Sequence, residues 1–73
     1  MPKLPSLRRI REERLLSQRE LGERAGISHV TIRNIERGLH EPRLSTVRKI
    51  AETLGVSGKE LMQEDTTAKE AAA

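Results

Sequence analysis

The sequence predicts an all-α domain built from five short helices. Apolar residues recur at helical spacing in five separate segments, and no segment shows the alternating pattern of a strand. Short stretches containing glycine, proline or serine separate these segments, as in compact helical bundles. The 73 residues allow one domain, and they include no Phe, Tyr, Trp or Cys. A core of Leu, Ile, Val and Ala must therefore stabilise the fold without disulfides.

The first two helices are expected over residues 7–14 and 17–25. In the first, apolar positions from Leu7 onward recur at helical spacing. Ser17 and Glu20 form a capping-box sequence at the start of the second, in which the serine hydroxyl accepts the Glu20 amide and the glutamate reaches back. Gly26 ends this helix because glycine readily adopts a left-handed backbone.

Three further helices are expected over residues 28–37, 44–54 and 57–63. Ser28 is placed to cap the first of them, which Gly38 ends. Gly55 ends the second, and Ser57 opens another capping-box sequence for the last. These helices complete a predicted domain over residues 1–63.

Charge is distributed unevenly along the chain, whose net charge is +3. Residues 1–59 contain 13 Lys or Arg against 7 Asp or Glu, whereas residues 60–73 contain 1 against 4. Ten of the 14 basic residues are arginines, the side chain best suited to bidentate phosphate and guanine contacts. We therefore expect a basic domain with a polyanionic partner, followed by an acidic, Ala-rich, disordered tail over residues 64–73.

Several other kinds of site are not expected. His29 and His40 are the only histidines, with no carboxylates clustered around them, so no metal or other cofactor is predicted. No nucleophile–base pair or phosphate loop points to an enzyme, and no small-molecule ligand is evident. No apolar run approaches the ~20 residues that span a membrane, and the start of the chain lacks a signal peptide, which favours the cytoplasm. The absence of aromatic residues disfavours binding of single strands.

The second and third helices have the spacing of a helix-turn-helix motif. Residues 26–28 form the short connection between them. Ile32 and Ile35 define the inward face of the third helix, and Ile27 fills the corner. Gly22 suits a close approach between the two helices, at some cost in helix propensity.

The outward face of the third helix is polar or basic and carries no acid. On a helical wheel, Val30, Asn34 and Arg37 lie opposite the inward face, with Thr31 and Arg33 at its flanks and His29 in the first turn. Asn pairs bidentately with adenine, Arg with guanine, and a small apolar group contacts the thymine methyl. This face therefore suits the base edges of double-stranded DNA.

Phosphate contacts are expected around the base-reading face. Basic, amide and hydroxyl groups can position a protein on the backbone without reading sequence. The candidates are Gln18, Arg19, Thr31, Arg37 and Arg43.

A buried ion pair is predicted between the first and third helices. The wheel places Glu36 at the edge of the inward face and Arg11 on the apolar face of the first helix. A charge on an apolar face needs a partner of opposite sign. We therefore predict that Arg11 and Glu36 pair and hold the third helix against the first.

These motifs resemble the phage repressor and Cro family, also called the xenobiotic-response-element (XRE) family, from about Leu7 to Leu61. The marks are Leu7-Arg8-x-Ile10-Arg11, Leu16-Ser17-Gln18-x-x-Leu21, Ala25-Gly26-Ile27-Ser28, Ile32-x-x-Ile35-Glu36-Arg37-Gly38, Pro42, Ile50-Ala51-x-x-Leu54-Gly55-Val56-Ser57 and Glu60-Leu61.

The resemblance implies a five-helix fold of the lambda-repressor type and a recognition helix that begins at Ser28. It implies the same Arg11–Glu36 pair, and a Gln18 that touches the DNA backbone and supports residue 29. Base reading is implied for Ser28, His29, Val30 and Asn34, with Arg33 as a further candidate.

Three positions depart from the family pattern. Leu15 stands where a glycine often closes the first helix, which predicts a strained or altered turn. Gly22 replaces a frequent alanine, a mild change. Glu41 occupies a loop that is often basic, which argues against a phosphate contact there.

Two functions follow from these observations. The first is a transcriptional regulator, expected to be a repressor, that binds DNA as a homodimer on half-sites about one helical turn apart. Its candidate dimer contacts are Leu39, Leu61 and Met62, although core packing is favoured for Leu61. The alternative is an antitoxin-like or co-activator subunit that uses the same fold to bind a protein, with the acidic tail as a possible contact.

Overall fold

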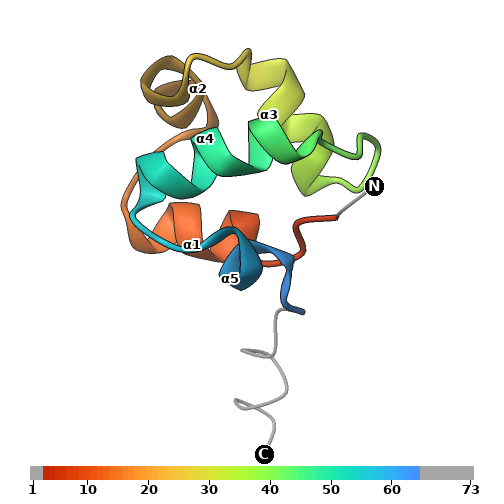
Figure 1. The fold of residues 1–73 in the computed structure, drawn as a ribbon. Coiled ribbons are helices and arrows are strands. Elements are labelled where there is room, and N and C mark those ends of the chain that lie inside the picture. Colours follow the sequence, from red (N-terminus) through yellow and green to blue (C-terminus); the bar gives the residue numbers. More distant parts are fainter. Residues whose placement is uncertain (1–2, 65–73) are drawn as a thin grey trace, which may run out of the picture.

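The computed structural model describes residues 3–64, and this segment is entirely helical apart from turns and loops. Its helices are α1 (Leu7–Glu13), α2 (Gln18–Ala25), α3 (His29–Glu36), α4 (Leu44–Leu54) and α5 (Gly58–Met62). In Figure 1, α4 crosses the middle of the molecule, with α2 and α3 on one side of it and α1 and α5 on the other. The predicted all-α fold and the order of its five helices are confirmed.

The expected helix ends differ from the observed ones by about one residue. Ser28 and Arg37 are the N-cap and C-cap of α3 rather than its first and last residues, and Ser57 is the N-cap of α5. The acidic tail predicted over residues 64–73 lies outside the described residues except for Glu64. Among the described helices, none combines the length and hydropathy needed to cross a membrane.

Local hydrogen bonds explain where α2 and α5 begin. The Glu20 amide donates to Ser17 Oγ at 3.0 Å, and the Ser17 amide donates to Glu20 Oε1 at 3.1 Å, so the predicted capping box is complete. The hydrogen bond from the Ser17 amide is the largest cause that lowers the pKa of Glu20, and the bond with the Ser17 hydroxyl is the second. At α5 the Glu60 amide donates to Ser57 Oγ at 3.1 Å, but within residues 3–64 the Ser57 amide makes no return bond to the Glu60 carboxylate.

The core is a single aliphatic cluster to which all five helices contribute. Each fully buried Leu or Ile side chain stabilises the fold by on the order of 1.5–3 kcal/mol through removal from water. Helix α4 contributes four buried apolar side chains to the cluster, so it links the α2–α3 half to the α1–α5 half. The buried members are Leu4, Leu7, Ile10, Leu16, Leu21, Ile32, Ile35, Val47, Ile50, Ala51, Leu54 and Leu61.

Ser6 ties the beginning of the described chain to α5, which the sequence did not predict. Its hydroxyl donates to the Gln63 carbonyl at 2.6 Å, and its amide donates to the Leu61 carbonyl at 3.3 Å. Ser6 is fully buried. These bonds hold α5 against α1 although 57 residues separate Ser6 from Gln63.

The turn between α1 and α2 is strained at Leu15, which is the first of the two outcomes expected from this residue. Leu15 has φ 58°, and no other described non-glycine residue has positive φ. Its side chain is 88% exposed, so packing does not compensate for this left-handed backbone.

Candidate nucleic-acid interface

Helices α2 and α3 form the predicted helix-turn-helix. Gly26 closes α2 with φ 72°, and the Ile27 amide donates to the Gly22 carbonyl at 2.8 Å. A Cβ atom at Gly22 would overlap the carbonyl oxygen of Ile27 and lie 3.1 Å from the His29 nitrogen. The predicted close approach at Gly22 is therefore confirmed, and it is made to the backbone of the turn. An alanine here requires the turn to shift, which is a larger change than the sequence indicated.

The two faces of α3 are as the wheel predicted. Ile32 and Ile35 are buried in the core. On the other side, His29, Val30 and Arg37 are exposed, and Thr31, Arg33 and Asn34 are half-buried. The hydroxyl of Ser28 accepts the Val30 amide at 3.2 Å, which fixes the first turn of α3.

The residues expected to contact DNA fall into separate groups. Ser28 and His29 border an open hollow along the turn, together with Arg19. Arg33 and Arg37 line a different hollow, which Gln18 also borders. Arg43 is exposed at the N-cap of α4 and makes no side-chain capping bond.

The predicted ion pair between Arg11 and Glu36 is confirmed and is bidentate. Arg11 Nε lies 2.6 Å from Glu36 Oε2, and Nη2 donates to Oε1 at 3.0 Å. The side chains are only 10% and 4% exposed. The third nitrogen, Nη1, donates to the Leu16 carbonyl at 2.7 Å. The hydrogen bond to Glu36 raises the pKa of Arg11 against the opposing effect of burial, so this cation is permanent.

Gln18 joins this ion pair, a contact that the sequence analysis missed. Its Nε2 donates to Glu36 Oε1 at 3.1 Å. The family resemblance assigned Gln18 to the support of residue 29, but the hydrogen bond of its amide nitrogen runs to Glu36. The first residue of α2, the C-terminal end of α3 and the middle of α1 are thus joined through one carboxylate.

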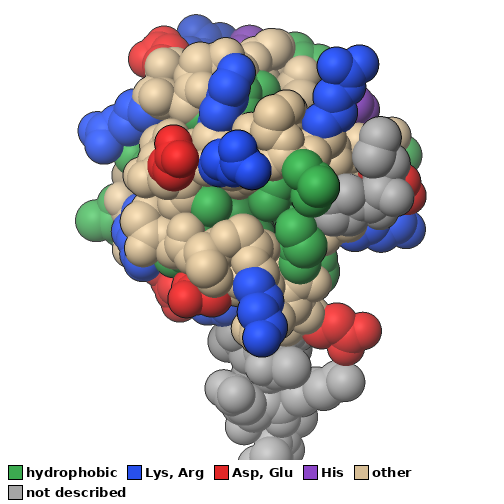
Figure 2. Space-filling view, viewed as in Figure 1, with side chains coloured by type: hydrophobic (Ala, Val, Ile, Leu, Met, Phe, Trp, Pro, Cys, Tyr) green, Lys and Arg blue, Asp and Glu red, His purple; other side chains and the backbone are tan. Residues whose placement is uncertain are grey.

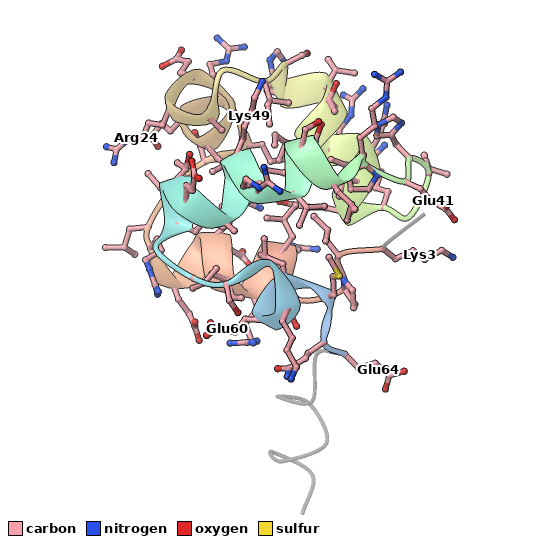
Figure 3. All side chains as sticks on the ribbon, in the orientation of Figure 1. Lys3, Arg24, Glu41, Lys49, Glu60 and Glu64 are labelled. Atoms are coloured by element: carbon pink, nitrogen blue, oxygen red, sulfur yellow. The ribbon has the colours of Figure 1, made fainter. Side chains whose placement is uncertain are left out.

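Charged side chains of both signs are exposed on both halves of the described molecule. In Figure 3, Arg24 lies at α2 and Lys49 on α4, whereas Glu60 and Glu64 lie beside α5 at the opposite end. Acidic groups at the α5 end are therefore far from the helix-turn-helix. Glu20 and Glu23 are exposed on α2, so the surface without an acid is the outward face of α3, and this face is attractive to a polyanion.

Comparison with known proteins places the domain in a family. The model of the HTH_3 helix-turn-helix family matches residues 7–61. The immunity repressor protein of Bacillus phage phi105 is 38% identical over 64 residues, which are 88% of this chain and 44% of that protein. The chain therefore spans less than half of that relative's length.

Two solved structures share the fold. The restriction-modification controller protein C.AhdI from Aeromonas hydrophila superposes with a TM-score of 0.73 at 31% identity, covering 75% of this chain and 83% of that one. The P22 c2 repressor, solved in complex with a synthetic operator, superposes with a TM-score of 0.77 at 26% identity, covering 89% of this chain and all of that one (100%). The resemblance to phage repressors that the motifs predicted is thereby confirmed: the chain belongs to the HTH_3 family of helix-turn-helix proteins.

Proposed function

We propose that this domain is a transcriptional regulator that binds double-stranded DNA sequence-specifically, with α3 in the major groove. The observation that supports this most strongly is the division of α3 into two faces. One face is buried in the core, and the other presents polar, basic and small apolar groups without an acid. The Arg11–Glu36 pair holds this helix at a defined angle to α1.

Base reading is assigned to the first turn of α3 and to Asn34 in its second half. Ser28, His29, Val30 and Asn34 are the proposed readers. The Asn34 amide suits adenine, and the Val30 side chain suits a thymine methyl. Arg33, the remaining candidate from the sequence, is considered separately below because it lies in the other hollow.

Phosphate contacts are proposed for the groups that flank these readers. Gln18 and Arg19 are at the start of α2, where the backbone amides favour anions, and Arg43 is at the start of α4. Thr31 and Arg37 lie on α3 and at its C-cap. Contacts of this kind position the protein without specifying sequence.

We further propose that the regulator is a repressor, works in the cytoplasm as a homodimer, and catalyses no reaction. An immunity repressor and an operator-bound repressor among its relatives support the first of these assignments. A dimer suits the two-fold symmetry of operators read by such motifs.

The face formed by α4 and α5 is the proposed dimer contact. It holds a shallow groove of about 340 Å³ that Leu44 and Met62 border, and both side chains are exposed. Figure 2 shows apolar side chains gathered at the centre of this face. Arg48 and Glu52 line the same groove. In a dimer related by a two-fold axis, Arg48 of one copy can therefore pair with Glu52 of the other. Leu61 is fully buried, which confirms its favoured role in the core and removes it as a dimer contact.

To test the function, duplexes that bind the protein are selected from a random pool. Binding of the selected duplexes is then measured by mobility shift at rising salt. We expect one sequence to be preferred over competitor DNA, with affinity that falls steeply as salt rises, because release of counterions from the DNA on binding is less favourable at higher salt. Equal affinity for all duplexes would contradict sequence-specific reading. A stable complex with a protein and none with any duplex would support the interaction-subunit alternative.

A further inference from the structure

A second polar hollow lies between α1, the start of α2 and the C-terminal half of α3. Its volume is about 260 Å³. We call it the arginine hollow, and its lining residues are Arg8, Arg11, Gln18, Arg33, Glu36 and Arg37. Four arginines thus surround a single carboxylate. The sequence analysis did not select Arg8, because nothing on α1 alone indicates which part of α3 it faces.

The one carboxylate of the arginine hollow is already held by Arg11 and Gln18. Glu36 accepts two hydrogen bonds from Arg11 and one from Gln18. Arg8 has an acidic neighbour outside the lining, since its Nε lies 3.5 Å from Glu12 on the exposed side of α1. The charges of Arg33 and Arg37 are therefore not balanced by Glu36.

Arg33 lines the hollow without an ion pair among residues 3–64. Its Nε is buried and has no hydrogen-bond partner within residues 3–64. A buried donor without a partner is destabilising, and so is the repulsion among neighbouring guanidinium groups. Arg33 and Arg37 are also one turn apart on α3, so their side chains project from the same side of the helix.

We propose that the arginine hollow binds a phosphate group of the DNA backbone, held by Arg33 and Arg37 from α3 and by Arg8 from α1. Guanidinium groups bind phosphate oxygens in a bidentate manner, and the side chains of Arg8, Arg33 and Arg37 all line the hollow. This assignment rests on the proposed function, and it moves Arg33 from base reading to backbone binding. The hollow also borders Gln18 at the start of α2, which is itself a proposed phosphate contact.

The salt dependence of DNA binding tests the assignment. Arg33→Gln is compared with Arg24→Gln, which removes the same charge from an exposed position at the end of α2. Loss of one phosphate contact reduces the slope of log K against log salt by about 0.9. We expect this reduction for Arg33→Gln, an unchanged preference among base sequences, and a wild-type slope for Arg24→Gln. Relaxed preference at one base pair with an unchanged slope would make Arg33 a base reader and overturn the proposal.

Chemical unfolding separates ligand binding from a structural role. Since the Arg33 Nε has no partner in the free protein, Arg33→Gln should unfold at the same or a higher urea midpoint than wild type. A lower midpoint would show that Arg33 stabilises the fold, which contradicts the proposal.

Inorganic phosphate distinguishes the hollow from the function as a whole. Thermal unfolding is followed in sodium phosphate and in sodium chloride of equal ionic strength, for wild type and for the double variant Arg33→Gln/Arg37→Gln. A phosphate-specific rise in Tm that the double variant loses shows that the hollow binds the anion even if no duplex is bound specifically. If Arg33→Gln reduces the salt slope of DNA binding but inorganic phosphate does not raise the Tm, the hollow binds the phosphodiester of DNA and not free phosphate. Absence of both effects overturns the proposal, whatever the outcome for sequence-specific binding.

Discussion

Arg11 and Glu36 show how one pair of residues sets the geometry of the proposed reading helix. The bidentate contact leaves neither side chain more than 10% exposed, and Gln18 and the Leu16 carbonyl complete the network. Burial of two charges is costly, so such a pair contributes little net stability over an apolar pair of the same shape. Its effect is on orientation, because α3 can satisfy Glu36 in one position only.

Removal of one charge of this pair should be severe. We expect Glu36→Gln to lower the free energy of unfolding by about 3 kcal/mol, because Arg11 is then buried without a counter-ion. Urea unfolding followed by circular dichroism measures the loss. The matched control is the double variant Arg11→Met/Glu36→Leu, which removes both charges and should recover most of the stability. A single variant as stable as wild type would show that the pair does not need its charge.

Leu15 offers the opposite case, a residue that opposes stability. A left-handed backbone costs a non-glycine residue about 1–2 kcal/mol. Glycine avoids this cost, but part of the gain is lost because a glycine makes the unfolded chain more flexible. We expect Leu15→Gly to raise the free energy of unfolding by roughly 0.5–1 kcal/mol, since the exposed side chain makes little contribution. Thermal unfolding should show a Tm several degrees above wild type. An unchanged or lower Tm would mean that the leucine side chain stabilises the turn.

At the scale of the element, α2 depends on its capping box. The folded protein lowers the pKa of Glu20 below its ordinary value near 4.5. A lowered pKa stabilises the fold above the ordinary value, and this stabilisation is lost as pH falls through the folded pKa. We therefore expect Glu20→Gln to reduce stability at neutral pH and to converge on wild type in acid. Urea midpoints at several pH values measure this difference, with Glu23→Gln as the control for net charge on the same helix. A difference that is constant with pH would contradict this role of the carboxylate.

For α3, the two kinds of DNA contact predict different binding defects. We expect Asn34→Ala to cost roughly 1–3 kcal/mol of binding and to relax preference at one base pair. Arg43→Ala, at the N-cap of α4, should weaken binding to all sequences alike and reduce the salt slope by about 0.9. Fluorescence anisotropy with a selected duplex and its single-base variants measures both. Uniform loss on every duplex for Asn34→Ala would place this residue with the phosphate contacts instead.

At the scale of the whole molecule, the α4–α5 face predicts self-association. Leu44 is 64% exposed, so Leu44→Glu leaves the monomer core intact while it introduces a charge into the proposed interface. We expect the dissociation constant of the dimer to rise at least about tenfold, because the variant loses the buried leucine from the interface. Analytical ultracentrifugation measures this. Leu39→Glu, in the loop after α3, is the comparison, and a loss of dimer for this variant alone would move the interface to that loop. A wild-type chain that stays monomeric at all concentrations would exclude the homodimer.

The sequence by itself determined the local structure and the two faces of each helix. Helix starts and stops follow from caps such as Ser17 and Gly26, and faces follow from the spacing of residues three and four apart, so both depend on near neighbours along the chain. Even the long-range Arg11–Glu36 pair was predictable, because one wheel placed Arg11 on an apolar face and the other placed Glu36 at the edge of one. These local rules were sufficient for the fold and for the outward face of α3.

Only the tertiary structure decided which side chains of different helices meet. The bond from Gln18 to Glu36, the bond from Ser6 to Gln63, and the approach of the turn to Gly22 depend on how the helices pack. The grouping of Arg8 with Arg33 depends on the same packing, because these residues lie on helices far apart in the sequence. Periodicity describes each helix on its own axis, whereas the angle and distance between two axes are set by how buried side chains fill the core.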